Sequence, residues 1–244
     1  MIAIIDYGAG NIKSVINAFK FLGHECVLLS EPGSLKEHSH IVLPGVGAFG
    51  EAMKKLKING MDEAIKEAVK SGKAFIGICL GMQLAMIEFA RDVLGLEDAN
   101  SMEFNKECKN PIIYLIDSFI DAHGKKQIRT HTSPLGGTMR LGAYNCDIKP
   151  KTLLAEIYGN AKSVKERHRH RYEFNNSYEK EFEKNGMMCV GRNPESDLVE
   201  IVEIPGLKWY IGTQFHPEYQ STVLHPHPLF LDFVKTSIEN QKKK

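Results

Sequence analysis

The sequence predicts an α/β fold, with an open, mostly parallel sheet, helices on both of its faces and an added antiparallel strand region in the second half. Three observations predict it. Strand-like and helix-like segments alternate in the first half, the strands there are continuous apolar runs, and the second half has strands that alternate apolar and polar residues. The 244 residues are 43% hydrophobic, which suffices for one sizeable core, so we expect a single domain over residues 1–244.

The first half consists of repeated strand–helix units. Residues 1–5 form an apolar strand, Asn11 is placed to cap the following helix, and Gly23 stands where that helix ends. Because uninterrupted apolar strands are covered on both faces, these units predict a parallel sheet between two helix layers. The remaining elements expected here are strands at 26–29, 41–43 and 73–78, and helices at 48–69, broken at Asn59-Gly60, and at 81–89.

The second half follows a different pattern. Residues 198–204 alternate apolar and acidic side chains, as a half-exposed strand does, and a Pro-Gly turn leads into a second strand at 209–215. Residues 167–172 are also expected to form a strand, with arginines on one face and histidines on the other. A closing helix is expected at 230–238. These strands predict the antiparallel region.

Charge and cysteine content limit the classes of partner. The chain has 31 basic and 30 acidic residues, so neither nucleic acid nor an anionic membrane surface is expected as its main partner. No apolar run is long enough to span a bilayer. The five cysteines are scattered without a CxxC pair, and this odd number without a signal peptide predicts a cytoplasmic location.

Residues 77–81, Gly-Ile-Cys-Leu-Gly, are the most informative segment of the chain. A cysteine on a tight strand-to-helix turn, with a glycine two positions to each side, is typical of a nucleophile elbow. Side chains in place of the glycines would collide with the strand and the helix. The positive end of the helix favours a thiolate at Cys79. The alternative interpretation is a buried structural cysteine beside an ordinary helix start.

Residues 214–218, Gln-Phe-His-Pro-Glu, end the strand at 209–215 and supply partners for Cys79. His216 can take the proton of the thiol and later deliver one to a leaving amine, while Glu218 can fix the tautomer of His216. A strand-end histidine by itself is more often a surface residue. Its occurrence together with the Gly-x-Cys-x-Gly segment predicts covalent catalysis by Cys79, His216 and Glu218.

With these residues in place, the chain resembles the class I, triad-type glutamine amidotransferases. Residues 1 to about 83 are similar to the glutaminase subunit of imidazole glycerol phosphate synthase, on segments 4–11 and 43–49. From about Phe75 to Ile238 the chain is similar to the glutaminase domain of CTP synthase, on segments 77–96, 136–142, 167–176 and 214–218. The two similarities overlap at the elbow, so the chain is either a mosaic of two amidotransferases or a divergent protein of one lineage.

The resemblance implies a flavodoxin-like sheet and hydrolysis of L-glutamine through a thioester on Cys79, without a cofactor. The ammonia would pass to a synthase partner, either the CTP synthase type of pyrimidine biosynthesis, which aminates UTP, or the imidazole glycerol phosphate synthase type of histidine biosynthesis. CTP synthase cannot be the activity of these residues alone, because they contain no P-loop. A free-standing γ-glutamyl hydrolase and a non-catalytic regulatory module of the same fold are the alternatives.

The resemblance also assigns binding roles. The oxyanion would meet the backbone N–H of Leu80 and that of Gly47 or its neighbour Val46, in the loop 44–47. A GTP effector is a further implication, which this loop argues against, because CTP synthases usually have Pro-Gly-Gly-Phe-Gly there. The residues expected to bind glutamine are Gly45, Gln83, Glu103, which would hold the α-ammonium, and Arg171, which would hold the α-carboxylate.

Two alternatives concern the charged second half. The segment 167–172 is also compatible with a solvated basic strand. The histidine pairs suggest a metal, but no cysteine or carboxylate completes a ligand set by spacing, so no metal is expected. The pairs are His168 with His170, and His225 with His227.

Overall fold

The structure is a computed structural model that describes residues 1–8, 11–45, 47, 49–115, 118–120, 126–128 and 139–241. Some residues of the predicted segments lie outside these ranges. They are residues 9–10 of the segment 4–11, Val46, one of the expected oxyanion donors, residue 48 of the segment 43–49, and residues 136–138 of the segment 136–142.

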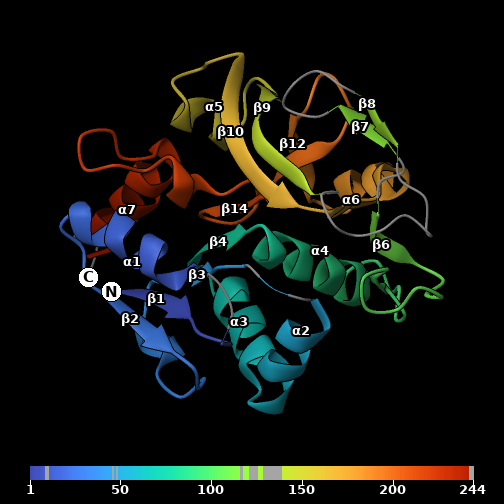
Figure 1. Ribbon diagram of the computed structural model, residues 1–244. Coiled ribbons are helices and arrows are strands. Elements are labelled where there is room, and N and C mark those ends of the chain that lie inside the picture. Colours follow the sequence, from blue (N-terminus) through green and yellow to red (C-terminus); the bar gives the residue numbers. More distant parts are fainter. Residues whose placement is uncertain are drawn as a thin grey trace.

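Within the described ranges, nine strands form the central sheet, in the order β10-β9-β12-β13-β14-β4-β3-β1-β2 (Figure 1). Neighbours from β14 to β2 are parallel, and neighbours from β10 to β14 are antiparallel. The predicted division into a parallel first half and an antiparallel second half is therefore confirmed. The strands are β1 (Ile2–Ile5), β2 (Cys26–Leu29), β3 (His40–Leu43), β4 (Ala74–Ile78), β9 (Arg140–Ile148), β10 (Ser163–His170), β12 (Met188–Arg192), β13 (Val199–Glu203) and β14 (Tyr210–Thr213).

Helices cover both faces of the sheet (Figure 1). One core cluster packs α2, α3, α4 and α6 against one face, and a second packs α1, α5 and α7 against the other. A 3-10 turn at Leu35–Glu37 precedes β3. The helices are α1 (Ile12–Phe21), α2 (Phe49–Ile58), α3 (Met61–Lys70), α4 (Leu80–Asp92), α5 (Leu153–Ile157), α6 (Glu179–Lys184) and α7 (Pro228–Gln241). None of them, over the described residues, is long and apolar enough to cross a membrane.

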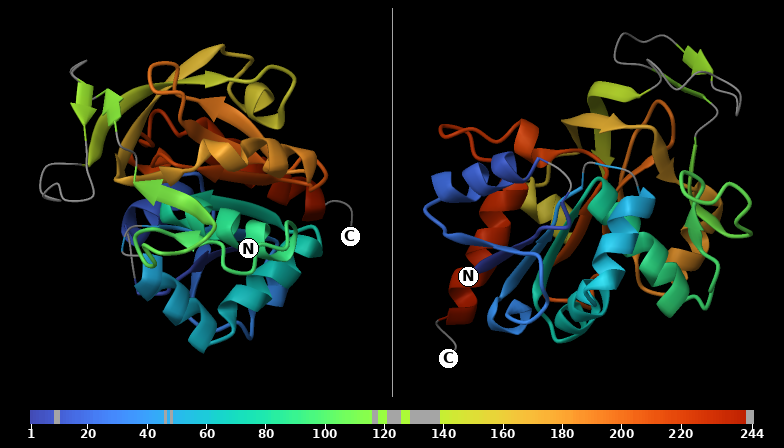
Figure 2. Two further views of the ribbon diagram at one scale, coloured as in Figure 1. Left: turned by 90° about the vertical axis from the view of Figure 1, so that its right-hand side faces the viewer. Right: turned by 60° about the horizontal axis from the view of Figure 1, so that its bottom comes forward.

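Two small sheets lie beside the main one. The first contains β5 (Asn100–Ser101), β6 (Pro111–Leu115) and β11 (Tyr172–Phe174), and the second is the hairpin of β7 (Ser118–Ile120) and β8 (Lys126–Ile128). Figure 2 shows this hairpin at the periphery. The strand predicted at 167–172 is divided, because β10 ends at His170 and β11 begins at Tyr172 in a different sheet. Arg171 therefore lies at the break between two sheets.

The prediction that residues 198–204 form a half-exposed strand was wrong. All five residues of β13 are buried, including Glu200 and Glu203. β13 lies inside the sheet, between β12 and β14, and its carboxylates have internal partners. Glu200 contacts Arg140 at 2.7 Å, and Glu203 accepts a hydrogen bond from the backbone N–H of Leu154 at 3.2 Å. The acidic residues of this alternating pattern therefore face an ion-pair partner and a backbone donor inside the protein instead of solvent.

Asn11 differs from its prediction in a smaller way. It does precede α1, but its side chain accepts a hydrogen bond from the Ser14 hydroxyl at 2.7 Å and none from a backbone N–H of the helix. Its backbone carbonyl instead accepts from the N–H groups of Ser14 and Val15. The start of α1 is therefore closed by the main chain.

Candidate active site

Cys79 lies between β4 and α4 in the strained conformation expected of an elbow. Its φ is 50° and its ψ is −105°, a backbone region that non-glycine residues rarely occupy. The chain packs tightly around it, because a Cβ on Gly81 would lie 1.9 Å from the carbonyl oxygen of Leu43, and one on Gly77 would lie 2.9 Å from the backbone of Gly81. The steric reason predicted for these two glycines is thus confirmed.

Parallel pairing of β14 with β4 brings the segment that contains His216 to Cys79. Thr213 lies opposite Ile78 in this pairing, and its carbonyl accepts the backbone N–H of Cys79 at 2.6 Å. His216 follows three residues later, and its own N–H donates to the carbonyl of Arg167 on β10 at 2.9 Å. The segment is therefore anchored to strands on both sides before it reaches the 3-10 turn at Pro217–Tyr219.

His216 and Glu218 form a buried pair next to the thiol. Nδ1 of His216 lies 2.8 Å from Oε1 of Glu218, and the His216 ring stacks on the ring of Tyr219. Burial lowers the pKa of His216, but the neighbouring Cys79 and the Glu218 carboxylate outweigh it and raise the pKa to about 11. The surroundings of His216 thus favour its charged imidazolium form.

A cavity of about 170 Å³ opens in front of Cys79. Its described lining does not include His216 and Glu218, which are buried beside the thiol. The lining also contains four residues that the sequence analysis did not single out for the site, namely Met139, Arg169, His170 and Tyr172. The predicted site residues that line the cavity are Gly45, Gly47, Cys79, Leu80, Gln83, Glu103 and Arg171.

Pro44 and Gly45 are held against the elbow by close packing and by a tyrosine. A Cβ on Gly45 would lie 2.5 Å from the backbone nitrogen of Gly81. The Tyr7 hydroxyl donates to the carbonyl of Pro44 at 2.5 Å. Burial and the charge of Cys79 raise the pKa of Tyr7, so it remains a neutral donor. Sequence reasoning missed this role of Tyr7, although the residue lies only two positions after the apolar strand β1.

Glu103 is already engaged with the protein. Its Oε2 accepts the backbone N–H of Phe49, at the start of α2, at 3.2 Å. Burial raises the pKa of Glu103, while this hydrogen bond and the charge of Arg171 oppose the shift. The carboxylate and the guanidinium expected to hold the two ends of glutamine are therefore close enough to interact across the cavity wall.

Gln83 connects the cavity to the segment that carries His216. Its Nε2 donates to the carbonyl of Tyr172 at 2.8 Å and to Oε1 of Gln214 at 3.0 Å. Gln214 in turn donates from its own Nε2 to Sγ of Cys79 at 3.6 Å. The expected substrate-binding residue Gln83 thus contacts the protein through its amide nitrogen.

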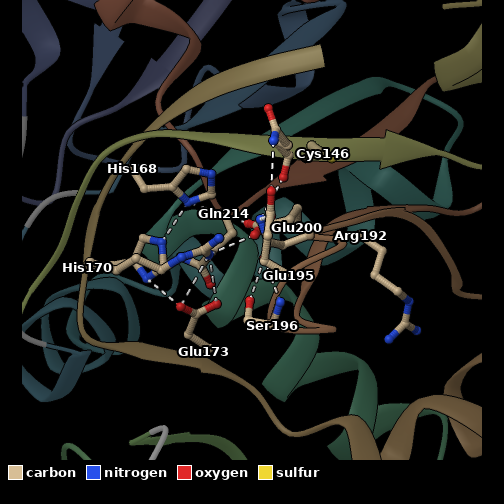
Figure 3. A network of polar contacts seen from close by, with 12 residues as sticks. Cys146, His168, His170, Glu173, Arg192, Glu195, Ser196, Glu200 and Gln214 are labelled. Atoms are coloured by element: carbon tan, nitrogen blue, oxygen red, sulfur yellow. Dashed lines mark hydrogen bonds and ion pairs between the residues drawn. The ribbon is translucent and has the colours of Figure 1, made fainter. Parts of the chain in front are cut away.

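A buried charged network lies next to the cavity wall (Figure 3). Arg140 contacts Glu200 at 2.7 Å and Glu173 at 3.4 Å. His168 lies 2.8 Å from His170, which also approaches Glu173 at 3.5 Å. Burial, and then the charge of Arg140, hold the pKa of His168 well below its usual range. The alternation in 167–172 predicted that His168 and His170 share a face, and both are buried on it.

The other histidine pair is separated. His227 is buried and its Nε2 contacts the Glu166 carboxylate at 3.1 Å, whereas His225 is exposed. Among the described residues, one group has the spacing of metal ligands, namely Glu179, Glu183 and Cys189. Its two carboxylates form ion pairs, Glu179 with Arg192 and Glu183 with Lys149.

Comparison with known proteins supports one family along the chain. The model of the class-I glutamine amidotransferase family matches residues 3–236. A CTP synthase from Helicobacter hepaticus is 45% identical over 242 residues, which are 99% of this chain and 43% of that protein. One from Campylobacter jejuni is 54% identical over 181 residues, 74% of this chain and 33% of that protein. The chain therefore spans less than half the length of these relatives.

A solved structure agrees with the sequence matches. The glutaminase domain of Trypanosoma brucei CTPS, with bound acivicin, superposes with a TM-score of 0.76 at 29% identity. The match covers 98% of this chain and 93% of that domain. The α/β fold with a mixed, mostly parallel sheet and an antiparallel region is therefore that of a CTP synthase glutaminase domain.

These matches bear on the mosaic hypothesis. The Helicobacter relative extends through both halves and past the elbow, so nothing in the comparisons supports a junction between two families. The described residues of the segments 4–11 and 43–49 lie at and just beyond the carboxyl ends of β1 and β3. Close packing there, as at Gly45 against the elbow, restricts which residues fit, so short segments can resemble those of another family. The chain belongs to the class-I glutamine amidotransferase family.

Proposed function

We propose that this chain hydrolyses L-glutamine to glutamate and ammonia, with Cys79 as nucleophile, His216 as acid–base and Glu218 as the carboxylate that orients His216. The observation that carries the proposal is the strained Cys79 on the wall of a cavity, beside a buried His216 whose Nδ1 lies 2.8 Å from Glu218. This arrangement matches the requirements for an activated thiol: a base beside it and a third group that holds the base.

The reaction would proceed in two steps. The Cys79 thiolate attacks the side-chain amide carbon of glutamine, and the C–N bond breaks as His216 delivers a proton to the departing ammonia. A γ-glutamyl thioester remains on Cys79. His216 then takes a proton from water, which attacks the thioester, and the C–S bond breaks to release glutamate. The N–H groups of Leu80 and Gly47 would hold the oxyanion in both steps.

Substrate binding is proposed at the same cavity. Arg171 would hold the α-carboxylate through two parallel N–H donors, and Glu103 would hold the α-ammonium. Gly45 and Gln83 would complete the walls, since both line the cavity with Cys79. The interaction of Arg171 with Glu103 supports this pairing, because a zwitterionic amino acid presents the opposite pair of charges.

The ammonia acceptor is proposed to be a synthetase domain of the CTP synthase type, which aminates UTP. The support is that CTP synthases match this chain over 33% to 43% of their own length. The acceptor site must lie outside these 244 residues, which contain no P-loop. The cytoplasmic location expected above fits this role, and all five cysteines are free thiols.

The test is a glutamate-release assay on the protein alone and with a CTP synthase synthetase domain, each with and without GTP. We expect turnover that Cys79→Ala abolishes while circular dichroism and melting stay unchanged. Labelling of Cys79 by a glutamine-analogue diazoketone is the second readout. Folded protein that neither turns over nor labels would favour a non-catalytic module, and faster release from γ-glutamyl amides than from glutamine would favour a γ-glutamyl hydrolase.

A further inference from the structure

Gln214 is a buried amide held rigidly beside Cys79. Its side chain is 0% exposed, and its backbone N–H donates to the carbonyl of Glu200 at 2.8 Å. The preceding residue, Thr213, accepts the backbone N–H of Cys79 at 2.6 Å. Two strands therefore fix the main chain of Gln214 relative to Cys79 and burial confines its side chain, so the direction of its amide depends on rotation about the last side-chain bond.

That rotation is decided by a backbone carbonyl on another strand. The carbonyl of Tyr172 can only accept hydrogen bonds, so the group of Gln83 that lies 2.8 Å from it must be the amide nitrogen. The same nitrogen lies 3.0 Å from the Gln214 side chain, which must present its oxygen there. The Gln214 nitrogen then faces Sγ of Cys79 at 3.6 Å. The reversed amide would bring two NH₂ groups together and turn an oxygen toward the sulfur.

We propose that Gln214 is a catalytic residue that stabilises the thiolate of Cys79 by an N–H···S hydrogen bond, and that Gln83 is the positioning residue that aims it. A donor that faces an ionised acceptor at a buried site favours the charged form, and the absence of water strengthens the interaction. The inference deepens the proposed function, because it takes Cys79 as the reacting thiol.

The hydrogen bond would act twice in one turnover. It stabilises the thiolate before attack, and it weakens when the electron pair of sulfur enters the new C–S bond of the thioester. When water attacks and the C–S bond breaks, the electron pair returns to sulfur. The N–H of Gln214 then donates to the thiolate again. His216 moves protons on the same path, whereas Gln214 keeps both of its own. Sulfur therefore has one partner that exchanges a proton and one that does not.

The experiment measures alkylation of Cys79 by iodoacetamide across pH, read on the Cys79 peptide by mass spectrometry because four other thiols are present. We expect Gln214→Leu to raise the pH midpoint of alkylation by about one unit, because one hydrogen bond to an ionised group is lost. At neutral pH the alkylation rate should then be about tenfold lower. Gln214→Glu keeps an acceptor for Gln83 but turns an oxygen toward sulfur, so its midpoint should rise at least as far.

Two further variants separate orientation from packing. Gln83→Met leaves Gln214 in place but removes the donor that aims it, so a smaller rise is expected. Thr213→Val is the matched control: Thr213 is equally buried, its hydroxyl contacts only the carbonyl of Phe215 among described residues, and its backbone bond to Cys79 is unaffected. Its midpoint should equal that of the wild type. If Gln214→Leu fails to fold, Gln214→Glu and Gln83→Met carry the test.

Unchanged midpoints in the folded Gln214 variants would overturn the inference, and so would an equal rise in Thr213→Val, which would indicate a packing effect. This outcome is independent of the proposed function, because alkylation needs no glutamine. A wild-type protein that shows the shifts but never hydrolyses glutamine would refute the glutaminase proposal and leave the role of Gln214 toward the thiol intact.

Discussion

Arg140 and Glu200 form an ion pair of 2.7 Å inside the protein, with side chains 1% and 0% exposed. The pair joins β9 to β13, and Glu173 extends it to β11, two residues beyond Arg171. Burial raises the pKa of the Glu200 carboxyl, and Arg140 opposes that shift. The main sheet and the small sheet thus meet at a buried cation beside the cavity.

Removing this cation should destabilise the fold. Arg140→Met leaves Glu173 and Glu200 buried without it, and breaking a buried pair by removing one partner typically costs about 3–5 kcal/mol of unfolding free energy. Arg192→Met is the control, because Arg192 is partly exposed with Glu179 and Asp197, and such pairs are worth about 1 kcal/mol or less. Urea unfolding at neutral pH measures both. Equal losses of unfolding free energy in Arg140→Met and Arg192→Met would contradict a special role for the buried pair.

Cys79→Ala should lower the pKa of His216. Burial alone lowers that pKa, and Cys79 together with Glu218 raises it to about 11, so without sulfur only Glu218 opposes burial. NMR titration of labelled histidine should place the His216 midpoint clearly lower in Cys79→Ala than in wild type. Glu218→Gln, which removes the other source of the increase, should lower it too. An unchanged His216 midpoint in both variants would show that His216 is not coupled to its two neighbours.

The same shift predicts how stability depends on pH. The folded-state pKa of His216 lies above the ordinary histidine value of 6.5, so its contribution is complete below pH 6.5 and is lost as pH rises toward about 11. Cys79→Ala should reduce this loss. Urea unfolding between pH 6 and 10 measures the difference in unfolding free energy between wild type and variant. This difference should become smaller as the pH rises.

Arg171→Lys should weaken binding of glutamine more than turnover. A lysine keeps the positive charge but loses the planar pair of donors that fits a carboxylate, so KM should rise about tenfold with a smaller change in kcat. Arg167→Lys is the control, because Arg167 is exposed on β10 and is not among the described residues of the cavity wall. Equal KM values for the two variants would remove Arg171 from the proposed substrate site.

Gly81→Ala should disrupt the elbow. The added methyl carbon would lie 1.9 Å from the carbonyl oxygen of Leu43. The oxygen is part of the main chain and the methyl is bonded directly to it, so β3 or α4 must move. We expect a loss of at least about 2 kcal/mol in unfolding free energy, together with loss of Cys79 labelling. Gly33→Ala has open space around its Cβ and should change neither property. Thermal melts and diazoketone labelling report the two effects.

The local parts of the site were predictable because their signals lie within a few residues. The apolar run before Cys79 and the glycines around it indicate strand, turn and helix through short-range sterics, and the structure has β4 and α4 there. The His-x-Glu spacing likewise makes contact between His216 and Glu218 feasible. Glu103 and Arg171 came from family resemblance, and the structure adds that both line the cavity with Cys79.

Other features depend on strands that are distant in sequence. Glu200 and Glu203 follow a pattern of half-exposed strands, yet they are buried because β13 lies inside a sheet whose neighbours supply Arg140 and the N–H of Leu154. The break at Arg171 arises because β11 pairs with β6 in another sheet. No periodicity within either segment contains this information.

The sequence by itself determined the alternating strands and helices, the elbow and the chemical identity of the proposed triad, because these depend on neighbouring residues and on side-chain type. Only the tertiary structure decided which amide faces the sulfur. Gln214 is 135 positions from Cys79 and 131 from Gln83, and its orientation follows from a carbonyl on a third segment. Hydrogen-bond direction at a buried site is a property of all its neighbours at once, and these come together only when the sheet has formed.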